Sequence, residues 1–237
     1  MGQALNQHTL MQALDWTYDK AVNGVAGLDS ASDPARDYMQ QTGSRRDQAQ
    51  SLIRWQSTKA TTSGFLTGLG GIVTLPVTLP INVASVIYIQ MRLVAAVAVM
   101  GGYDVRDDRV KVLVYACLTG NAAKDIIKDV GIVIGRKLTE RAIRGICAKT
   151  LTAINQKVGF RLLTKFGQKG VINLGKLVPV AGGVIGGSLD AVATRTIGHI
   201  ARETFIQCAV KPRPLGRGYK ALARRAKGVF LQAIVSV

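Results

Sequence analysis

A stretch of 32 residues without a charged side chain, residues 60–91, limits most strongly what this chain can fold into. A helix needs about 20 apolar residues to cross a bilayer, so the stretch is long enough to do so. Pro76 and Pro80 interrupt it, and each removes a backbone donor and disfavours helical geometry in the residue before it. We therefore expect two helices, at residues 63–73 and 80–100, joined by a proline turn.

Such a helical hairpin has three possible roles: a buried core, a pair of membrane-inserting helices, or a core that opens to insert. Threonine and amide side chains are scattered through it, including Asn82 and Gln90, which makes it less apolar than most membrane spans. This composition favours the buried core, and the other two roles stay open.

Glycines recur at helical spacing in the apolar segments. The second such segment, residues 177–190, carries two Gly-Gly pairs and continues at helical spacing to residue 205. A glycine costs a helix about 1 kcal/mol relative to alanine, so glycines four residues apart suggest a compensating close approach of another helix. We expect helix-packing glycines at Gly64, Gly68, Gly182, Gly183, Gly186 and Gly187.

Two charged residues lie in or beside these apolar segments, Arg92 and Asp190. A buried charge is costly unless it is paired. We therefore predict an ion pair between Arg92 and Asp190 that joins the two apolar segments. The alternative is that Arg92 extends along its stem to the surface.

The rest of the chain also has helical periodicity. We expect helices at residues 10–22, ended by Asn23-Gly24, at residues 44–61, and from Asp33-Pro34 onward. Others follow at residues 110–118, after a cap at Asp104 or Asp107, around Lys124 and Lys128, and at residues 132–154. No convincing series of alternating strands occurs, so the prediction is an all-α fold with a single helical domain over residues 1–210.

Charge is distributed very unevenly. The net charge is +17, and residues 130–237 hold nineteen basic and three acidic side chains. A field of one sign attracts polyanions, which means nucleic acid or an anionic membrane. We predict that the membrane is bound by Arg136, Lys137, Arg141, Arg144, Lys220, Arg224, Arg225 and Lys227.

We interpret the last residues, 211–237, as a separate basic extension. It opens with the stiff sequence Lys-Pro-Arg-Pro and continues as an amphipathic helix with apolar residues on one face. Such a helix can lie in a membrane interface. Docking onto the body of the protein is the alternative.

Sites for catalysis, metals and cofactors are weakly supported. The three cysteines lie far apart, which is not the spacing of a disulfide framework or a zinc site. Residues 170–177 resemble a phosphate-binding loop, but Leu177 stands where Ser or Thr would bind magnesium. His199 and Glu203 are spaced like two metal ligands and lack a third. We expect no enzyme activity, no metal and no cofactor. An uncharacterised enzyme remains the third possibility.

Nucleic-acid binding is the main alternative to membrane binding, because many phosphates could be neutralised by this charge. Against it, aromatic residues for base stacking are sparse in the basic half and no known reader motif occurs.

Several ordered motifs resemble the bacterial EcsC family. They include Gly-Phe-Leu-Thr-Gly-Leu-Gly-Gly from Gly64, Gln-Met-Arg ending at Arg92, Gly-Phe-Arg-Leu-Leu-Thr-Lys-Phe-Gly from Gly159, and the glycine-rich residues 179–190. The resemblance covers residues 10–206. Members of this family are helical, often membrane-associated proteins with no established activity, so the resemblance implies a bacterial source and a helical fold and supplies no catalytic residue.

With no secretory signal visible, we expect a cytoplasmic protein at the inner face of the plasma membrane. The family's name suggests an effect on an envelope process such as transport or secretion, with a protein partner there. The oligomeric state stays open.

Overall fold

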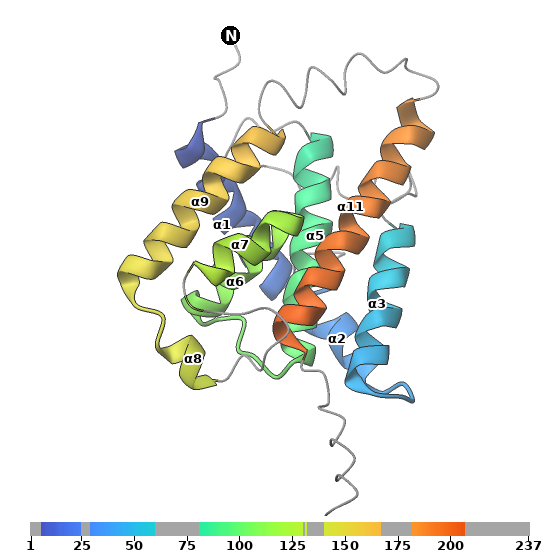
Figure 1. Ribbon diagram of the computed structural model, residues 1–237. Helices are drawn as coiled ribbons and strands as arrows, with labels where there is room; N and C mark the ends of the chain where they lie inside the picture. The colour runs from blue at the N-terminus through green and yellow to red at the C-terminus, as the bar shows by residue number, and fades with distance from the viewer. Residues whose placement is uncertain are drawn as a thin grey trace, which may run out of the picture. The chain divides into compact units, whose positions relative to one another are not determined.

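The computed structural model describes residues 6–24, 29–59, 81–129, 131, 140–166 and 182–206. They belong to one compact unit, Met1–Gln207, and form helices with no strand among them (Figure 1). The α-helices are α1 (Gln7–Asn23), α2 (Ser32–Met39), α3 (Arg45–Lys59), α5 (Ile81–Met100), α6 (Asp108–Leu118), α7 (Ala123–Lys128), α8 (Glu140–Arg144), α9 (Ala148–Phe166) and α11 (Gly182–Phe205), with a 3-10 turn, η1 (Gly120–Ala122), before α7. The all-α prediction is confirmed.

Helix α5 forms the centre of this unit. It packs against α1, α2, α3, α6 and α11, and Figure 1 shows it between α6 and α11. Its side chains from Val83 to Met100 are almost all buried. In the described part of the chain it alone is long and apolar enough to span a membrane. In this structure its apolar surface is covered by neighbouring helices, as the buried-core interpretation requires.

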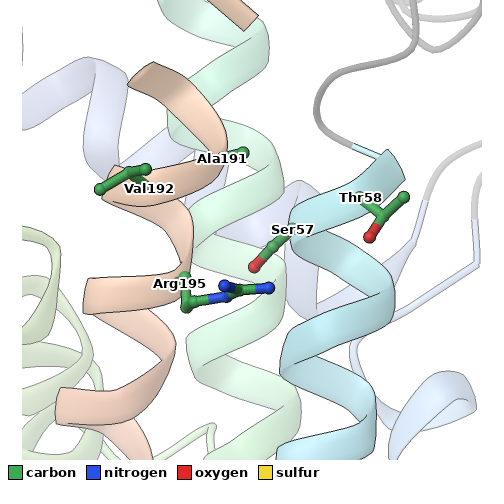
Figure 2. Close-up of a pocket in the computed structure, with 5 residues that line it drawn as sticks. All are labelled: Ser57, Thr58, Ala191, Val192 and Arg195. Atoms are coloured by element: carbon green, nitrogen blue, oxygen red, sulfur yellow. The ribbon is translucent and has the colours of Figure 1, made fainter. Parts of the chain in front are cut away.

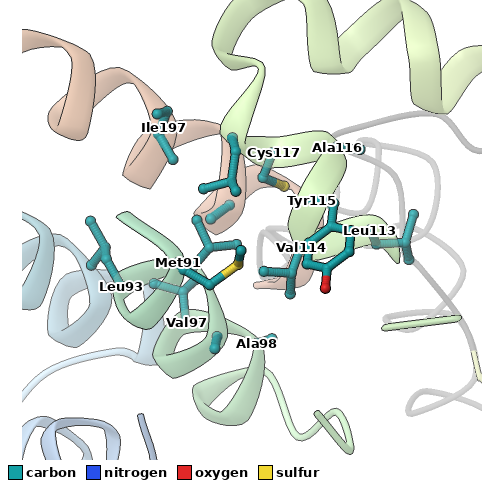
Figure 3. Close-up of a cluster of buried hydrophobic side chains, with 14 of the residues drawn as sticks. Met91, Leu93, Val97, Ala98, Leu113, Val114, Tyr115, Ala116, Cys117 and Ile197 are labelled. Atoms are coloured by element: carbon teal, nitrogen blue, oxygen red, sulfur yellow. The ribbon is translucent and has the colours of Figure 1, made fainter. Parts of the chain in front are cut away.

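Buried hydrophobic side chains connect α5 to α6 and α11. Figure 3 shows Met91 and Val97 of α5 beside Val114 of α6, with Ile197 of α11 nearby. All four side chains are essentially inaccessible to solvent. At about 25 cal/mol per Å² of buried apolar surface, such side chains each contribute about 1.5–3 kcal/mol to folding.

Polar side chains connect α1 to α6. The Tyr18 hydroxyl donates a hydrogen bond to the carbonyl of Val105 at 2.6 Å, and the Tyr115 hydroxyl donates to Asp15 at 2.8 Å. The two tyrosine rings meet edge to face with centroids 5.6 Å apart. These contacts hold the loop before α6 against α1.

Most predicted helix ends agree with the structure. Helix α1 ends at Gly24, which has a φ of 76°, and the side chain of Asp107 caps α6 by accepting a hydrogen bond from the N–H of Arg109. Pro34 lies in the first turn of α2, and α5 begins directly after Pro80. Helix 63–73 lies outside the described residues, as does the extension 211–237.

The single helix predicted over residues 132–154 is wrong. Helix α8 ends at Arg144 and α9 begins only at Ala148. Gly145 lies in the turn between them. Glycine has the lowest helix propensity of all residues except proline, which favours a break here. The carbonyl of Ile146 accepts a hydrogen bond from Arg109 Nε at 3.3 Å, so a side chain of α6 occupies this acceptor in the break.

Candidate anion-binding surface

Arg92 does not form the predicted pair with Asp190. Its guanidinium Nη2 lies 3.6 Å from Asp29 Oδ2, and the side chain of Asp29 is 79% exposed. Arg92 itself is buried apart from this end, and its Nε has no hydrogen-bond partner. The arginine therefore reaches toward the surface, where an exposed carboxylate and solvent compensate its charge.

Asp190 interacts with a different basic residue. Burial raises the pKa of Asp190, and the positive charge of Lys165 on α9 partly offsets this rise. The apolar helices that the ion pair was predicted to connect, α5 and α11, do pack together. Their polar connection is a hydrogen bond from Gln90 Nε2 to Thr194 Oγ1 at 3.3 Å.

The predicted packing glycines fall into two groups. Gly182, Gly183, Gly186 and Gly187 lie in the first two turns of α11, as the periodicity predicted. Gly64 and Gly68 lie outside the described residues. The structure adds Gly198, where a Cβ atom would lie 2.8 Å from Ile53 Cγ2 of α3 and 3.2 Å from Leu93 Cδ2 of α5. No glycine four residues away marks it in the sequence, which is why spacing alone missed it.

Of the eight predicted membrane-binding residues, two lie in the described part of the chain. Arg141 and Arg144 are in α8, and the side chain of Arg144 is exposed. Both belong to a short helix rather than to the long basic helix that was predicted. The others, Arg136, Lys137, Lys220, Arg224, Arg225 and Lys227, lie outside the described residues.

A second basic surface lies where α3 packs along α11, and we call it the α3–α11 seam. It consists of Arg46 from α3 and of Arg195, His199 and Arg202 from α11. The three α11 residues follow the i, i+4, i+7 spacing that places side chains on one helix face. Arg202 Nη1 donates a hydrogen bond to Gln50 Oε1 of α3, which fixes the two helices relative to each other.

The pKa of His199 reflects the positive charge of the seam. Burial lowers the pKa of His199, and the positive charges of Arg202, Arg195 and Arg46 lower it further, against an opposing contribution from Glu203. Like charges disfavour the protonated imidazole. The side chain is therefore neutral near pH 7 and offers one N–H donor.

Two carboxylates lie near the seam and both have other partners. Asp47 accepts hydrogen bonds from the N–H and hydroxyl of Ser44, which together with Arg202 and Arg46 hold its pKa below the usual range. Glu203 Oε2 lies 3.9 Å from Lys124 Nζ. These interactions only partly balance the three arginines.

A small hollow opens at one end of the seam. It has a volume of about 210 Å³ and is lined by Ser57 and Thr58 of α3 and by Ala191, Val192 and Arg195 of α11. Figure 2 shows the guanidinium of Arg195 extending from α11 toward Ser57. An arginine and two hydroxyl groups are suited to a small anion.

A second hollow, of about 270 Å³, lies between α1 and the start of α6 and has a different chemistry. Asp15, Asp19 and Asp108 line it, together with Lys111 and Tyr18. Lys111 Nζ lies 2.6 Å from Asp15 Oδ1 and 5.6 Å from the ring centroid of Tyr18. The ammonium group of Lys111 therefore already neutralises part of the acidic charge in this hollow, and the cluster stabilises the contact between α1 and α6.

No group of three potential metal ligands occurs among the residues that the structure describes. Cys117 is buried, and its burial raises the thiol pKa to about 12, which suppresses the thiolate that a nucleophile or ligand requires. His199 and Glu203 do lie close enough to influence each other electrostatically, and the nearest partner of the carboxylate is Lys124.

The model of the EcsC protein family matches residues 6–207. The chain belongs to the EcsC protein family. No curated protein and no solved structure is significantly similar to it. The EcsC match begins at Asn6, whose side chain caps α1, and ends just after α11. The basic extension 211–237 lies beyond the matched residues, as the resemblance implied.

The α3–α11 seam of this EcsC protein cannot be predicted from the sequence alone. The spacing of Arg195, His199 and Arg202 is visible in the sequence, and it predicts a basic face on one helix. Arg46 joins that face only because α3 packs along α11, which no local pattern indicates.

Proposed function

We propose that this EcsC protein is a non-enzymatic protein that binds anionic lipid at the inner face of the plasma membrane. The observation that carries the proposal is the charge distribution: nineteen basic against three acidic side chains in residues 130–237. A basic group close to an anionic leaflet contributes about 1 kcal/mol of binding free energy. Several such groups acting together give stable attachment.

The packing of α5 supports attachment at the membrane surface rather than insertion of this helix. Its apolar side chains are already buried against five other helices, so moving it into lipid would expose the apolar faces of those neighbours. Arg195 of the α3–α11 seam and Arg144 of α8, in contrast, are exposed on the surface of the helical body.

Only the family's name suggests a biological process for this protein. An EcsC protein held at the membrane would modulate an envelope process such as transport or secretion through a protein partner. No reaction is assigned to it, and no cofactor.

Membrane fractionation of the native protein tests the proposal. We expect the protein in the membrane pellet, with release by a high-salt wash, because ionic attraction is screened by salt. Retention through both salt and alkaline carbonate would contradict surface attachment and indicate integral insertion.

Vesicle binding by the purified protein distinguishes lipid from nucleic acid. We expect co-sedimentation with phosphatidylcholine vesicles that contain phosphatidylglycerol and none with phosphatidylcholine alone. Double-stranded DNA and RNA serve as competitors. Absence from the membrane fraction, together with tight DNA or RNA binding that strengthens with polymer length, would replace this proposal by nucleic-acid binding.

A further inference from the structure

The hollow at the end of the α3–α11 seam contains a cation that has no partner in the described part of the chain. Arg195 is exposed and makes no hydrogen bond or ion pair with any residue that the structure describes. Arg202 bonds to Gln50, and Arg92 lies beside Asp29. Arg195 therefore keeps its full donor capacity for a ligand.

The hydroxyl of Ser57, opposite Arg195, is an adaptable donor (Figure 2). Ser57 Oγ donates to the carbonyl of Ile53 at 2.7 Å, and Thr58 Oγ1 donates to the carbonyl of Arg54 at 3.0 Å. Each of these carbonyls lies one helical turn back, where it also accepts a backbone N–H of the helix. A hydroxyl that rotates toward an anion therefore leaves no acceptor unpaired.

We propose that this hollow binds a phosphate group, with Arg195 donating two parallel hydrogen bonds to its oxygens and Ser57 donating a third. The inference rests on the proposed function and names the chemical group that the membrane would present. Guanidinium groups match phosphate geometry in this forked arrangement. The remaining arginines of the seam add long-range attraction.

Size and surroundings narrow the ligand further. Pockets for drug-sized ligands and cofactors have volumes of about 300–1,000 Å³. The hollow, at about 210 Å³, suits a phosphate with a small alcohol rather than a nucleotide. Val192 on its rim is 64% exposed, and Trp55, one helical turn before Thr58, is 50% exposed. Exposed apolar side chains beside a phosphate site favour a lipid headgroup over free phosphate.

The position of the hydroxyls on α3 opposes an anion in the hollow. Ser57 and Thr58 lie in the last turn of the helix, where the carbonyl ends of the peptide dipoles carry partial negative charge. The guanidinium has to outweigh this repulsion. Binding should therefore depend strongly on Arg195 and much less on either hydroxyl.

The first experiment is an NMR titration of the full chain with inorganic phosphate, with sodium chloride at equal ionic strength as the reference. We expect phosphate to shift the amide signals of Ser57, Thr58 and Arg195 and to raise the pKa of the His199 imidazole. Arg195→Gln should weaken the binding at least tenfold, a loss typical of charge-assisted hydrogen bonds. Ser57→Ala should weaken it less.

Arg161→Gln is the matched control, because Arg161 is an exposed arginine on α9, away from the hollow. It removes the same charge and should leave phosphate binding unchanged. Arg195→Lys keeps the charge without the forked geometry and should fall between the wild type and Arg195→Gln. Equal responses to phosphate and chloride, or equal phosphate binding by Arg195→Gln and Arg161→Gln, would overturn the inference.

The second arm separates lipid phosphate from free phosphate and the hollow from the general function. Vesicles containing phosphatidylglycerol should bind Arg195→Gln at least tenfold more weakly than Arg161→Gln. If both variants bind these vesicles like the wild type, the protein still binds membranes but the hollow does not hold the headgroup. If the wild type binds no anionic vesicle yet binds phosphate through Arg195, the proposed function fails and the hollow is a site for free phosphate.

Discussion

At Gly101 two segments that are distant in sequence come close together. A Cβ atom built there would lie 2.4 Å from the backbone oxygen of Phe205, at the end of α11, and 2.9 Å from the ring of Tyr103. The ring of Tyr103 in turn meets that of Phe205 with centroids 5.4 Å apart. A backbone atom cannot turn aside as a flexible side chain can, so this glycine fixes how the ends of α5 and α11 meet.

We therefore expect Gly101→Ala to lower the free energy of unfolding by about 3 kcal/mol, the upper end of the usual cost of overpacking. Urea denaturation followed by circular dichroism measures this loss. Gly102→Asn is the control: a Cβ there meets nothing within 4 Å, and Asn tolerates its positive φ of 84°. Equal stability of the two variants would show that the contact with Phe205 does not constrain the helix ends.

His199 gives a test of the seam that requires no ligand. The charge of Arg195 contributes to the lowered pKa of His199, so Arg195→Gln should raise that pKa toward the ordinary value of about 6.5. NMR titration of the imidazole signals measures it, with Arg161→Gln as the control that should leave it unchanged. An unchanged pKa in the Arg195 variant would mean that the two side chains are too far apart to interact.

The lowered pKa of His199 also makes the stability of the folded protein depend on pH. The unfolded chain takes up a proton at His199 near pH 6.5, whereas the folded protein does so only at lower pH. Stability should therefore decrease as the pH falls through the interval below 6.5. In Arg195→Gln this part of the decrease should be smaller, and thermal unfolding over that pH range measures the difference.

At the scale of elements, Gly198 lies where α11 packs most closely against both α3 and α5 among the glycines of the described chain. Helix α11 faces Ile53 and Leu93 at this point, and both side chains are fully buried. Ile53 is β-branched and stiff, so it has little freedom to move away from an added methyl group.

Gly198→Ala should lower the free energy of unfolding by about 1–3 kcal/mol despite the better helix propensity of alanine. The loss should shrink in an Ile53→Ala background, which a double-mutant cycle measures. The control is Gly159→Ala on α9, where the three atoms nearest to the new Cβ all belong to the flexible side chain of Gln7. That variant should be neutral or slightly stabilising, and an equal loss at both glycines would refute the packing argument.

Sequence periodicity predicted the elements well and their partners less well. The ends of α1, α5 and α6 follow from local signals, namely Gly24, Pro80 and Asp107. The break between α8 and α9 escaped prediction, because the apolar pattern continues across Gly145. A pattern that repeats on both sides of a turn does not show that the turn exists.

Arg92 illustrates why partners are harder to predict than elements. Burying the charge of Arg92 is costly without a partner, and the structure places the carboxylate of Asp29 within reach of its guanidinium. Sequence alone offers no way to choose Asp29 over Asp190, because the choice depends on which segments pack beside α5. The seam was missed for the same reason, since Arg46 and Arg195 meet only through tertiary packing.

At the scale of the whole molecule, the family match leaves a strongly basic segment at the end of the chain outside the family domain. The EcsC match ends at residue 207, and residues 211–237 hold seven basic and no acidic side chains. Every described helix, with its core and its caps, lies before that boundary. The extension therefore contributes to net charge without belonging to the family domain.

Ending the chain after residue 210 tests this division. Because the described core lies wholly in residues 6–206, the shortened protein should keep its cooperative unfolding and its midpoint in urea. Its net charge falls from +17 to +10, and its binding to vesicles containing phosphatidylglycerol should weaken at least tenfold, since each basic group near the surface contributes about 1 kcal/mol. A version of the full chain with Lys220, Arg224, Arg225 and Lys227 changed to Gln is the matched control for charge. If that variant binds vesicles like the wild type, or if the shortened chain unfolds at much lower urea, the extension acts by docking onto the helical body rather than by attracting lipid.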